Sequence, residues 1–599
     1  MARAMSLAAP FVLLDDARSG GAAARLYRDP VAIIEAQTVD QVAPALGRVR
    51  AGISAGHHAA GFLTYEAAPA FEPRAVGRRT DTHIAPPTPL LWFGLFATAE
   101  EVSDPAAYLP DGAGAWIGAP EPTISREAYD VALRQVLDLI AAGDVYQANL
   151  TFRARVPFAG DPLALYAAVR SRAAAGWGAI VATGDHLQLS FSPELFFHLQ
   201  SDALTCRPMK GTARRAADPS RDDQVADALA EDEKQRAENL MIVDLMRNDL
   251  SRVAAAGSVR VPALFAVERY PTVHQMTSTV TARLAPDRDA IDVLAALFPC
   301  GSITGAPKVR AMQVLSDIEQ SPRGAYTGSI GAISPNGDAQ FNVAIRTLVI
   351  ANGDDHATLG LGGGIVADSN ADSEWDEALA KGAFLTHGQR TPDLIETMRF
   401  DPDAGILLIE RHLARMKASA ARLGFVFDRH DARNELQAAT FRLRAPARIR
   451  LLLSQSGRIT IEVAPMPPAR PAPLEVTLVP LPVSRSDYRL RHKTSNRRFY
   501  DEARRVGGTA EVVFVDPDGF LTEGSFTNVF VERNGRLLTP PLARGLLPGV
   551  LRAELLETGR ATEQNLTPAD LAAGFYVGNA LRGLIPALVA VAEAGGRSL

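Results

Sequence analysis

Residues 360–365 read Gly-Leu-Gly-Gly-Gly-Ile, a glycine run within a segment where strand-like and helix-like patterns alternate. The run is not a dinucleotide fingerprint, because Ile365 replaces the last glycine of that pattern and Asp368 follows too soon to bind a ribose. Residues 301–308, Gly-Ser-Ile-Thr-Gly-Ala-Pro-Lys, likewise lack the ending of a phosphate loop. Consecutive glycines leave backbone N–H groups open to a carboxylate, although a tight turn explains the run equally well.

Two acidic helical segments lie on either side of the segment 301–308. One contains Glu238, beside a nearly continuous apolar run, and the other contains Glu374 and Glu377. The i,i+3 spacing of Glu374 and Glu377 puts both carboxylates on one helical face. Such a pair is usually a solvated surface, but Mg²⁺ is also commonly held by one or two carboxylates together with substrate oxygens. Periodicity alone does not bring Glu238 and Glu377 together.

Composition excludes several classes of protein. The 599 residues are 47% hydrophobic and 22% charged, with a net charge of −6. Large cores are therefore expected. The charge does not indicate a nucleic-acid-binding protein. A membrane protein is not expected either, since no stretch approaches the roughly 18 apolar residues of a membrane helix. The two cysteines, Cys206 and Cys300, are too few for a disulfide framework or a thiolate metal site. The start of the chain lacks a secretory pattern, so a cytoplasmic location is expected.

Lysine is rare in this chain. Only six of the 62 basic residues are lysines, namely Lys210, Lys234, Lys308, Lys381, Lys417 and Lys493. Chemistry that needs a primary amine therefore has few candidates.

The pattern along the chain predicts two large parts. Residues 1–119 are expected to be a strand-rich part of the first domain, 120–386 its catalytic part, 387–392 a linker and 393–599 a second domain. A helix is predicted from Ser125 to near Gly143, and another from Glu410 to Leu423. The Pro-rich passage 464–473 is expected to divide the second domain into two lobes.

Several motifs of the first part occur together in a fixed order. They are Gly-Asp-Val-Tyr-Gln-Ala-Asn-Leu (143–150), Ser-Pro-Glu (192–194), Pro-Met-Lys-Gly-Thr (208–212), Ala-Glu-Asn (237–239), Val-Asp-Leu-Met-Arg-Asn-Asp (243–249), residues 301–308, Ile-Arg-Thr (345–347) and Gly-Gly-Gly-Ile-Val (362–366). In this order and spacing the chain resembles the chorismate-utilising enzymes. The resemblance implies a large α/β domain with α+β character, whose site lies between two β-sheet layers.

The same resemblance implies roles for individual residues. Glu238 and Glu377 would hold Mg²⁺ with Glu374 close by, and Glu194 would be the general acid for the leaving C4 hydroxyl. The implied substrate-binding residues are Gln147, His274, Thr304, Tyr326, Arg346, Gly362, Gly363 and Gly364, of which Tyr326, Arg346 and the three glycine amides would hold a carboxylate.

Members of this family differ in the nucleophile that meets chorismate. Isochorismate and salicylate synthases carry a lysine base where Gln147 stands, and glutamine cannot act as a base. Anthranilate synthases carry alanine at the position of Lys210, whereas this lysine is similar to the one in aminodeoxychorismate synthases, whose amine attacks C2. That role requires an unprotonated amine. Ammonia would then come from a separate glutamine amidotransferase subunit, because no domain with a nucleophilic cysteine is visible in the sequence.

The second part offers Lys493 within Arg-His-Lys-Thr-Ser-Asn-Arg (491–497), a cation-rich setting that favours a lowered amine pKa. Lys417 is predicted to be solvated. With Glu523 and Pro-Gly-Val-Leu-Arg (548–552), this pattern resembles the fold-type IV pyridoxal-phosphate enzymes, which include class IV aminotransferases and aminodeoxychorismate lyases. The resemblance implies that Lys493 binds the cofactor covalently, Glu523 pairs with its ring nitrogen, and Arg415, Gly549, Val550 and Leu551 meet its phosphate. Arg582 would bind a substrate carboxylate, and leucine at 551 in place of threonine favours a lyase.

Together the two resemblances predict a fused enzyme that makes p-aminobenzoate from chorismate and ammonia, with Mg²⁺ and pyridoxal phosphate as cofactors. An alternative is an anthranilate-type synthase fused to a branched-chain or D-amino-acid aminotransferase. A second alternative is that one half is an inactive scaffold or an allosteric module. A homodimer through the C-terminal domain is a candidate assembly.

Overall fold

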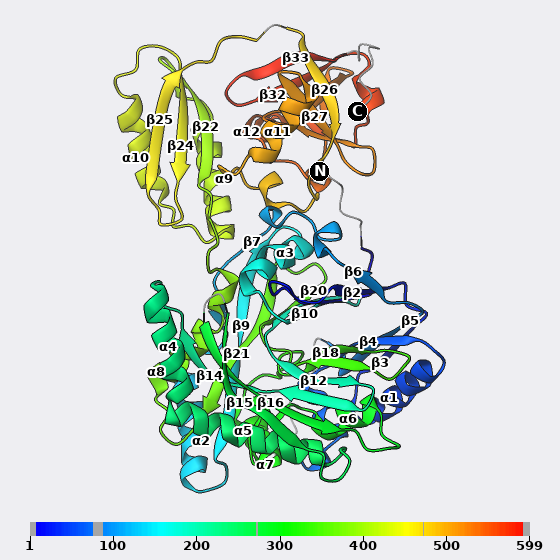
Figure 1. Cartoon of the computed structure of the whole chain (residues 1–599). Coiled ribbons are helices and arrows are strands. Elements are labelled where there is room, and N and C mark those ends of the chain that lie inside the picture. Colours follow the sequence, from blue (N-terminus) through cyan, green and yellow to red (C-terminus); the bar gives the residue numbers. More distant parts are fainter. Residues whose placement is uncertain (1–6, 76–87, 271–272, 471, 591–599) are drawn as a thin grey trace.

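The computed structural model describes residues 7–75, 88–270, 273–470 and 472–590 (Figure 1). Two large sheets occupy the first part of the chain, and two smaller sheets occupy the part that follows residue 392. No helix in the described ranges is long and apolar enough to cross a membrane.

The first large sheet contains both the glycine run and the segment that begins at Gln147. Its order is β17 (Gly305–Ala306), β9 (Gln147–Ala159), β21 (His356–Ile365), β20 (Thr347–Ala351), β11 (His186–Ser192), β10 (Trp177–Ala182), β1 (Phe11–Asp15), β2 (Ala24–Arg28) and β6 (Glu100–Val102). The short strands β7 (Trp116–Ile117) and β8 (Glu121–Pro122) also pair with β9.

The second large sheet contains Lys210 at one end. Its order is β14 (Met209–Arg214), β16 (Val273–Arg283), β13 (Ala203–Arg207), β12 (Leu195–Gln200), β19 (Ala339–Asn342), β18 (Ser329–Ile333), β4 (His58–Leu63), β5 (Leu91–Phe96) and β3 (Ala32–Ala36), with β15 (Arg260–Arg269) paired to β16.

The glycine run is a strand rather than a turn. Gly362, Gly363 and Gly364 lie opposite Thr151, Leu150 and Asn149 in the antiparallel pair of β21 and β9. Because glycine lacks Cβ, this strand can lie unusually close to side chains from other elements. The alternative of a tight turn is therefore excluded.

The two large sheets pack against each other and carry helices on their outer faces. One buried cluster joins Val12 and Val181 of the first sheet to Phe62, Trp92 and Ile330 of the second. The helices of this part are α1 (Val39–Ser54), α2 (Arg126–Ala141), α3 (Pro162–Ala173), α4 (Pro219–Glu231), α5 (Glu233–Ser251), α6 (Ala290–Leu297), α7 (Lys308–Ile318) and α8 (Ala371–Ala380). The helix expected after Ser125 is confirmed, since Ser125 accepts a hydrogen bond from Ala128 N as its N-cap.

The last two hundred residues form two lobes. The first lobe is the sheet β23 (Gly405–Ile406), β22 (Leu394–Asp401), β24 (Ala447–Leu453) and β25 (Ile459–Pro465), with α9 (Ile409–Arg422) and α10 (Arg429–Thr440). The second is β28 (Leu521–Gly524), β27 (Glu511–Val515), β26 (Leu474–Pro480), β33 (Gly583–Val589), β32 (Phe575–Asn579), β29 (Asn528–Arg533), β30 (Arg536–Thr539) and β31 (Ala561–Glu563), with α11 (Arg498–Gly507) and α12 (Val550–Glu557). The described residues of the Pro-rich passage begin within the end of β25 and precede β26, so the two lobes meet where the sequence predicted a division.

Candidate functional site

Lys210 is held at the junction of β14 and α5. Its Nζ lies 3.0 Å from Glu238 Oε2, and about one fifth of its side chain is exposed. Asn239, the next residue on α5, donates from Nδ2 to the carbonyl of Lys210 at 3.1 Å and accepts from Ser278 Oγ at 2.6 Å. The main chain of Lys210 is therefore fixed to α5, while its amine remains within reach of solvent or a ligand.

The glycine strand approaches Lys210 closely. A Cβ placed on Gly364 would lie 2.8 Å from both Lys210 Nζ and Gln147 Nε2. Gln147 is almost fully buried, and its Oε1 accepts no hydrogen bond from the described residues. A buried acceptor without a partner is costly, so this oxygen is available to a donor on a ligand.

Helix α8 brings two further carboxylates to the same strand. Glu374 accepts from Ser369 Oγ at 2.7 Å, and its Oε2 would lie 3.3 Å from a Cβ on Gly363. Glu377 is paired with Lys381 at 2.9 Å, and Lys381 also donates to the carbonyl of Gly362. Burial, and then repulsion from Glu377, raise the pKa of Glu374, whereas Lys381 lowers the pKa of Glu377. The positive charge of Lys210 lowers the pKa of both.

These carboxylates fit a divalent cation only as part of a shared coordination shell. Within the described ranges, no three His, Cys, Asp or Glu side chains are close enough together to hold a metal ion by themselves. Magnesium commonly keeps several waters and takes one or two protein carboxylates plus substrate oxygens. The mutual repulsion of Glu374 and Glu377 is the feature that a cation would relieve. The donor chemistry of Glu238, Glu374 and Glu377 therefore fits Mg²⁺.

Glu194 has the surroundings of a general acid. It follows β11, is 3% exposed, and accepts from Ser302 Oγ at 2.6 Å. Burial raises the pKa of Glu194 to about 7, although the hydrogen bond from Ser302 favours the ionised form. A carboxyl group with such a pKa can give up a proton near neutral pH. Cys300 is in turn 3.2 Å from Ser302 Oγ.

His274 and Thr304 are both fully buried, and each contacts other groups of the protein. His274 Nε2 lies 2.8 Å from Asp222 Oδ1 of α4, and Asp222 also accepts from Arg215. Thr304 Oγ1 donates to the carbonyl of Gly301 at 3.1 Å. A role for either residue at a substrate stays a prediction.

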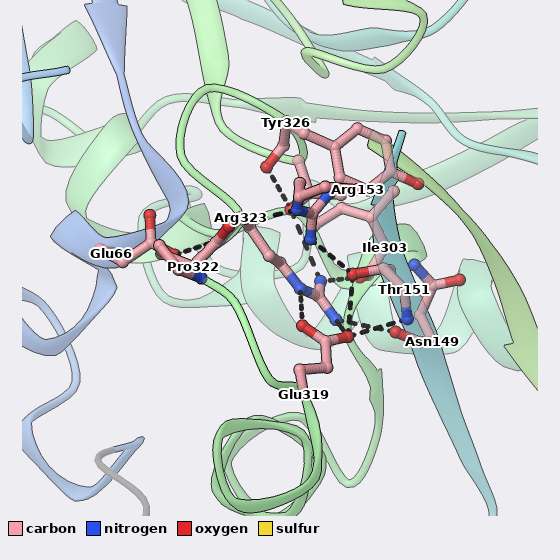
Figure 2. Close-up of polar contacts among 10 residues, drawn as sticks. Glu66, Asn149, Thr151, Arg153, Ile303, Glu319, Pro322, Arg323 and Tyr326 are labelled. Carbon is pink, nitrogen blue, oxygen red and sulfur yellow. Dashed lines mark hydrogen bonds and ion pairs between the residues drawn. The ribbon is translucent and has the colours of Figure 1, made fainter. Parts of the chain in front are cut away.

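Tyr326 belongs to a buried polar cluster that also contains two arginines (Figure 2). Arg153 lies over the ring of Tyr326, 5.0 Å from its centroid, and Arg323 forms a bidentate pair with Glu319. A Cβ on Gly360 would fall 2.0 Å from the Tyr326 ring, so only glycine allows this packing against β21. The cluster fixes the position of the Tyr326 ring.

Arg346 has a strained backbone. Its φ is +51°, in the left-handed region that non-glycine residues seldom adopt, and such strain is concentrated at functional sites. Burial lowers the pKa of Arg346, and its guanidinium lies over the face of Phe384. Binding of a carboxylate by this guanidinium stays a prediction.

Lys493 lies between β26 and α11, where its carbonyl accepts a hydrogen bond from Ile395 N of the first lobe. Burial lowers the pKa of Lys493 to about 7, opposed by Glu396 and reinforced by Arg415 and Arg497. The expected effect of neighbouring cations is therefore present, but burial is the larger cause. Lys417 on α9 is exposed, as predicted.

Arg415 is oriented by a buried carboxylate. Its Nε and Nη2 donate to Glu396 at 2.8 and 2.6 Å, and its Nη1 donates to the carbonyl of Pro548, just before α12. His412 makes a further 2.6 Å contact with Glu396. Arg415 thus lies next to the predicted phosphate-binding backbone, held by a bidentate ion pair.

Glu523 lies on β28 in a fully enclosed setting. It accepts from Tyr500 Oη at 2.6 Å and from Leu547 N at 3.0 Å, and burial raises its pKa to about 7. The turn after it is held by Glu511, which accepts from Ser525 N and from Thr527 Oγ1. A buried acid of this kind suits the cationic ring nitrogen of pyridoxal phosphate, because that positive charge would keep Glu523 ionised.

The predicted phosphate-binding backbone is the start of α12. Gly549 is the N-cap, and a Cβ there would fall 1.8 Å from Asn528 Oδ1, so glycine is required. Val550 is buried, and Leu551 is partly buried. The first N–H groups of a helix attract anions, which fits a phosphate. Arg582 is partly exposed and donates to the carbonyl of Pro468, and its substrate role stays a prediction.

Sequence reasoning missed several residues that support these sites. They are Ser302, Lys381, Arg153, Glu396, Tyr500 and Glu511. Only Glu396 carried a signal, because it directly follows the apolar residues Leu394 and Ile395 in the strand Leu394–Asp401, and an acid buried there requires a partner.

Comparisons with known proteins find two families in successive parts of the chain. A model of the chorismate binding enzymes matches residues 9–387, and a model of the class IV amino-transferases matches residues 393–589. The aminodeoxychorismate synthase component 1 of Klebsiella aerogenes is 45% identical over 264 residues, which are 44% of this chain and 58% of that protein. The anthranilate synthase component 1 of Haloferax volcanii is 38% identical over 291 residues, 48% of this chain and 56% of that protein. The chain thus spans less than two thirds of these relatives.

A solved structure shows the same fold in the first part. The anthranilate synthase component I from Streptococcus pneumoniae TIGR4 is 26% identical, with a TM-score of 0.52, over 64% of this chain and 93% of that one. The two-layered arrangement of the large sheets is therefore shared with enzymes of this group.

Proposed function

The chain belongs to the chorismate binding enzymes and carries a class IV amino-transferase domain after them, and from this premise we propose that it makes p-aminobenzoate in two steps. Chorismate and ammonia would give 4-amino-4-deoxychorismate in the first domain, and the second domain would remove pyruvate. Residues 387–392 would be the linker. The observation that carries the proposal is the position of Lys210 Nζ between Glu238 and the glycine strand.

In the first step Lys210 is the nucleophile. Its neutral amine attacks C2 of chorismate as the C4 hydroxyl leaves, and Glu194 supplies the proton to that hydroxyl. Ammonia then attacks C4 and expels the lysine. Lys210 must leave its ion pair with Glu238 to act in this way. Tyr326, Arg346 and the amides of Gly362–Gly364 would hold a substrate carboxylate, with Gln147, His274 and Thr304 around the ring.

Glu238, Glu374 and Glu377 would hold Mg²⁺, which neutralises substrate carboxylate charge when bound. The same three carboxylates are paired or coupled with Lys210 and Lys381 in the protein. A cation at this position would compete with the lysines for negative charge. Glu238 would then be shared between the cation and the Lys210 amine.

In the second domain pyridoxal phosphate, when bound, draws electrons away from the carbon that bears the substrate amine. Lys493 would hold the cofactor covalently and then move the ring proton, a task suited to an amine with a pKa of about 7. Glu523 would pair with the ring nitrogen, while Arg415 and the start of α12 would bind the phosphate. Arg582 would bind a substrate carboxylate. Aromatisation of the ring drives the loss of pyruvate.

Ammonia would be delivered by a separate glutamine amidotransferase. The relatives named component 1 imply a second component by that name. Free ammonium can replace such a subunit in a test.

The decisive experiment supplies the purified chain with chorismate, ammonium, Mg²⁺ and pyridoxal phosphate, and identifies the products by mass spectrometry. We expect p-aminobenzoate and pyruvate. Anthranilate as the product would overturn the first step. Accumulation of aminodeoxychorismate, with no p-aminobenzoate, would overturn the second.

A further inference from the structure

Residues 484–492, the segment that leads to Lys493, are in contact with the first domain. Ser484 Oγ donates to Asp161 Oδ2 at 3.0 Å, and Arg489 Nη2 lies 3.5 Å from Asp111 Oδ2. Asp161 is also the N-cap of α3, since its other oxygen accepts from Leu163 N. The contacts are therefore made by ordered positions of the first domain, close in sequence to the cofactor lysine.

A tryptophan of the first domain completes a core of the second. Trp116 on β7 is 4% exposed and belongs to the same buried cluster as Leu394, Met416 and Tyr488. Strand β7 lies where the two domains meet (Figure 1). Burial of a large aromatic side chain is strongly favourable, so the contact is part of the folded core rather than a loose encounter.

Gly114 is a point of close approach between the two domains. A Cβ on Gly114 would lie 2.6 Å from Asp487 Oδ2, and Asp487 cannot easily move because it forms a buried bidentate pair with Arg489. The missing side chain of Gly114 is thus required for the segment to dock.

On its other side, Lys493 is fixed by β22. The carbonyl of Lys493 accepts from Ile395 N at 2.8 Å, and Ser495 N donates to the carbonyl of Asp393. The lysine therefore lies between a strand of its own domain and a segment that the first domain holds.

We propose that the first domain supplies positioning residues for Lys493, namely Asp111, Gly114, Trp116 and Asp161. The inference rests on the proposed role of Lys493 as the cofactor lysine. The physical reason is that enclosure keeps the amine neutral, and a segment released from the first domain admits water around it. The first domain thereby sets the reactivity of the second site without touching its substrate.

The test uses the full chain with Gly114→Ala, and Gly47→Ala as the matched control, because a Cβ on Gly47 meets nothing within 4 Å. A second variant, Asp161→Ser, keeps a good N-cap residue but is too short to reach Ser484. In the cofactor-free chain, the pH dependence of Lys493 labelling by an amine-reactive reagent is followed by peptide mass spectrometry. Pyridoxal phosphate affinity is measured from its visible absorbance.

We expect Gly114→Ala to move the labelling midpoint of Lys493 upward by about one pH unit and to weaken pyridoxal phosphate binding about tenfold. Asp161→Ser should shift both in the same direction by less, and Gly47→Ala should match the wild type. Chorismate consumption by the first domain serves as the check that each variant is folded. Wild-type midpoints and affinities in both interface variants would overturn the inference. Failure of wild-type Lys493 to bind the cofactor would instead contradict the proposed function. The labelling midpoints would still test whether the first domain positions Lys493.

Discussion

The two lysines proposed as reactive amines have different surroundings. Lys210 is partly exposed and is balanced by the carboxylate of Glu238, with Glu374 and Glu377 nearby. Lys493 is enclosed, and burial lowers its pKa to about 7 despite the presence of Glu396. The Lys210 amine therefore depends on its ion pair with Glu238, which can be broken, whereas the Lys493 amine depends on its burial. If both lysines act as proposed, the chain prepares its two reactive amines by different routes.

The largest effect is expected from Lys210→Ala. Loss of the amine removes the nucleophile that attacks C2, so formation of aminodeoxychorismate should fall to background. The measurement is the rate of chorismate consumption with ammonium and Mg²⁺. Conversion of added aminodeoxychorismate to p-aminobenzoate should be unaffected, which controls for folding. An unchanged rate in Lys210→Ala would mean that Lys210 does not distinguish this chain from anthranilate synthases.

Lys493→Ala should reverse that pattern. We expect the first step to proceed normally and aminodeoxychorismate to accumulate, because no amine is left to hold the cofactor or to move the ring proton. Chromatography of the reaction mixture separates the intermediate from p-aminobenzoate. Undiminished release of p-aminobenzoate would contradict the role of Lys493.

The enclosure of Lys493 also predicts an effect on stability. Its pKa lies below the usual 10.5 in the folded chain, so between about pH 7 and 10.5 the unfolded chain binds more protons and stability rises with pH. Lys493→Met should therefore stabilise the cofactor-free chain by a few kcal/mol at or below pH 7, and by progressively less toward pH 10.5. Denaturant unfolding at several pH values measures the difference. The exposed Lys417→Met is the matched control, and a pH-independent difference would argue against an enclosed amine.

The smallest expected effect concerns the acid rather than the amine of the first site. Glu194 must be protonated to act, so the first step should decline as pH rises through about 7. The hydrogen bond from Ser302 stabilises the carboxylate, and Ser302→Ala should move this decline upward by about one pH unit. Ser302→Thr keeps the hydroxyl and should retain the wild-type profile. An unchanged pH profile in Ser302→Ala would show that the hydrogen bond from Ser302 does not set the pKa of the catalytic acid.

Local patterns predicted much of the fold. The helix after Ser125 was predictable because its apolar residues recur at helical spacing and its N-cap is adjacent in sequence. The division into two lobes at the Pro-rich passage was predictable for a similar local reason. The glycine run left a turn and a ligand-binding segment equally open, because its role as a strand depends on pairing with β9, about two hundred residues earlier.

The candidate sites were also predictable only in part from the sequence. The family motifs brought Lys210, Glu238 and Glu194 into consideration, but their mutual geometry depends on packing between distant elements. Ser302 beside Glu194, and Arg153 beneath Tyr326, are contacts between segments that no periodicity links. Trp116 is the clearest case, since most members of its buried cluster belong to another domain.

Residues 387–392, proposed as the linker, have a further consequence. Six residues span at most about 20 Å when fully extended, and Gln389 is itself bonded to the carbonyl of Ile117. Even if every docking contact opened, the two domains could not diffuse apart. For short tethers the effective concentration of one partner at the other is in the millimolar range, so the covalent connection alone keeps the domains available to dock again.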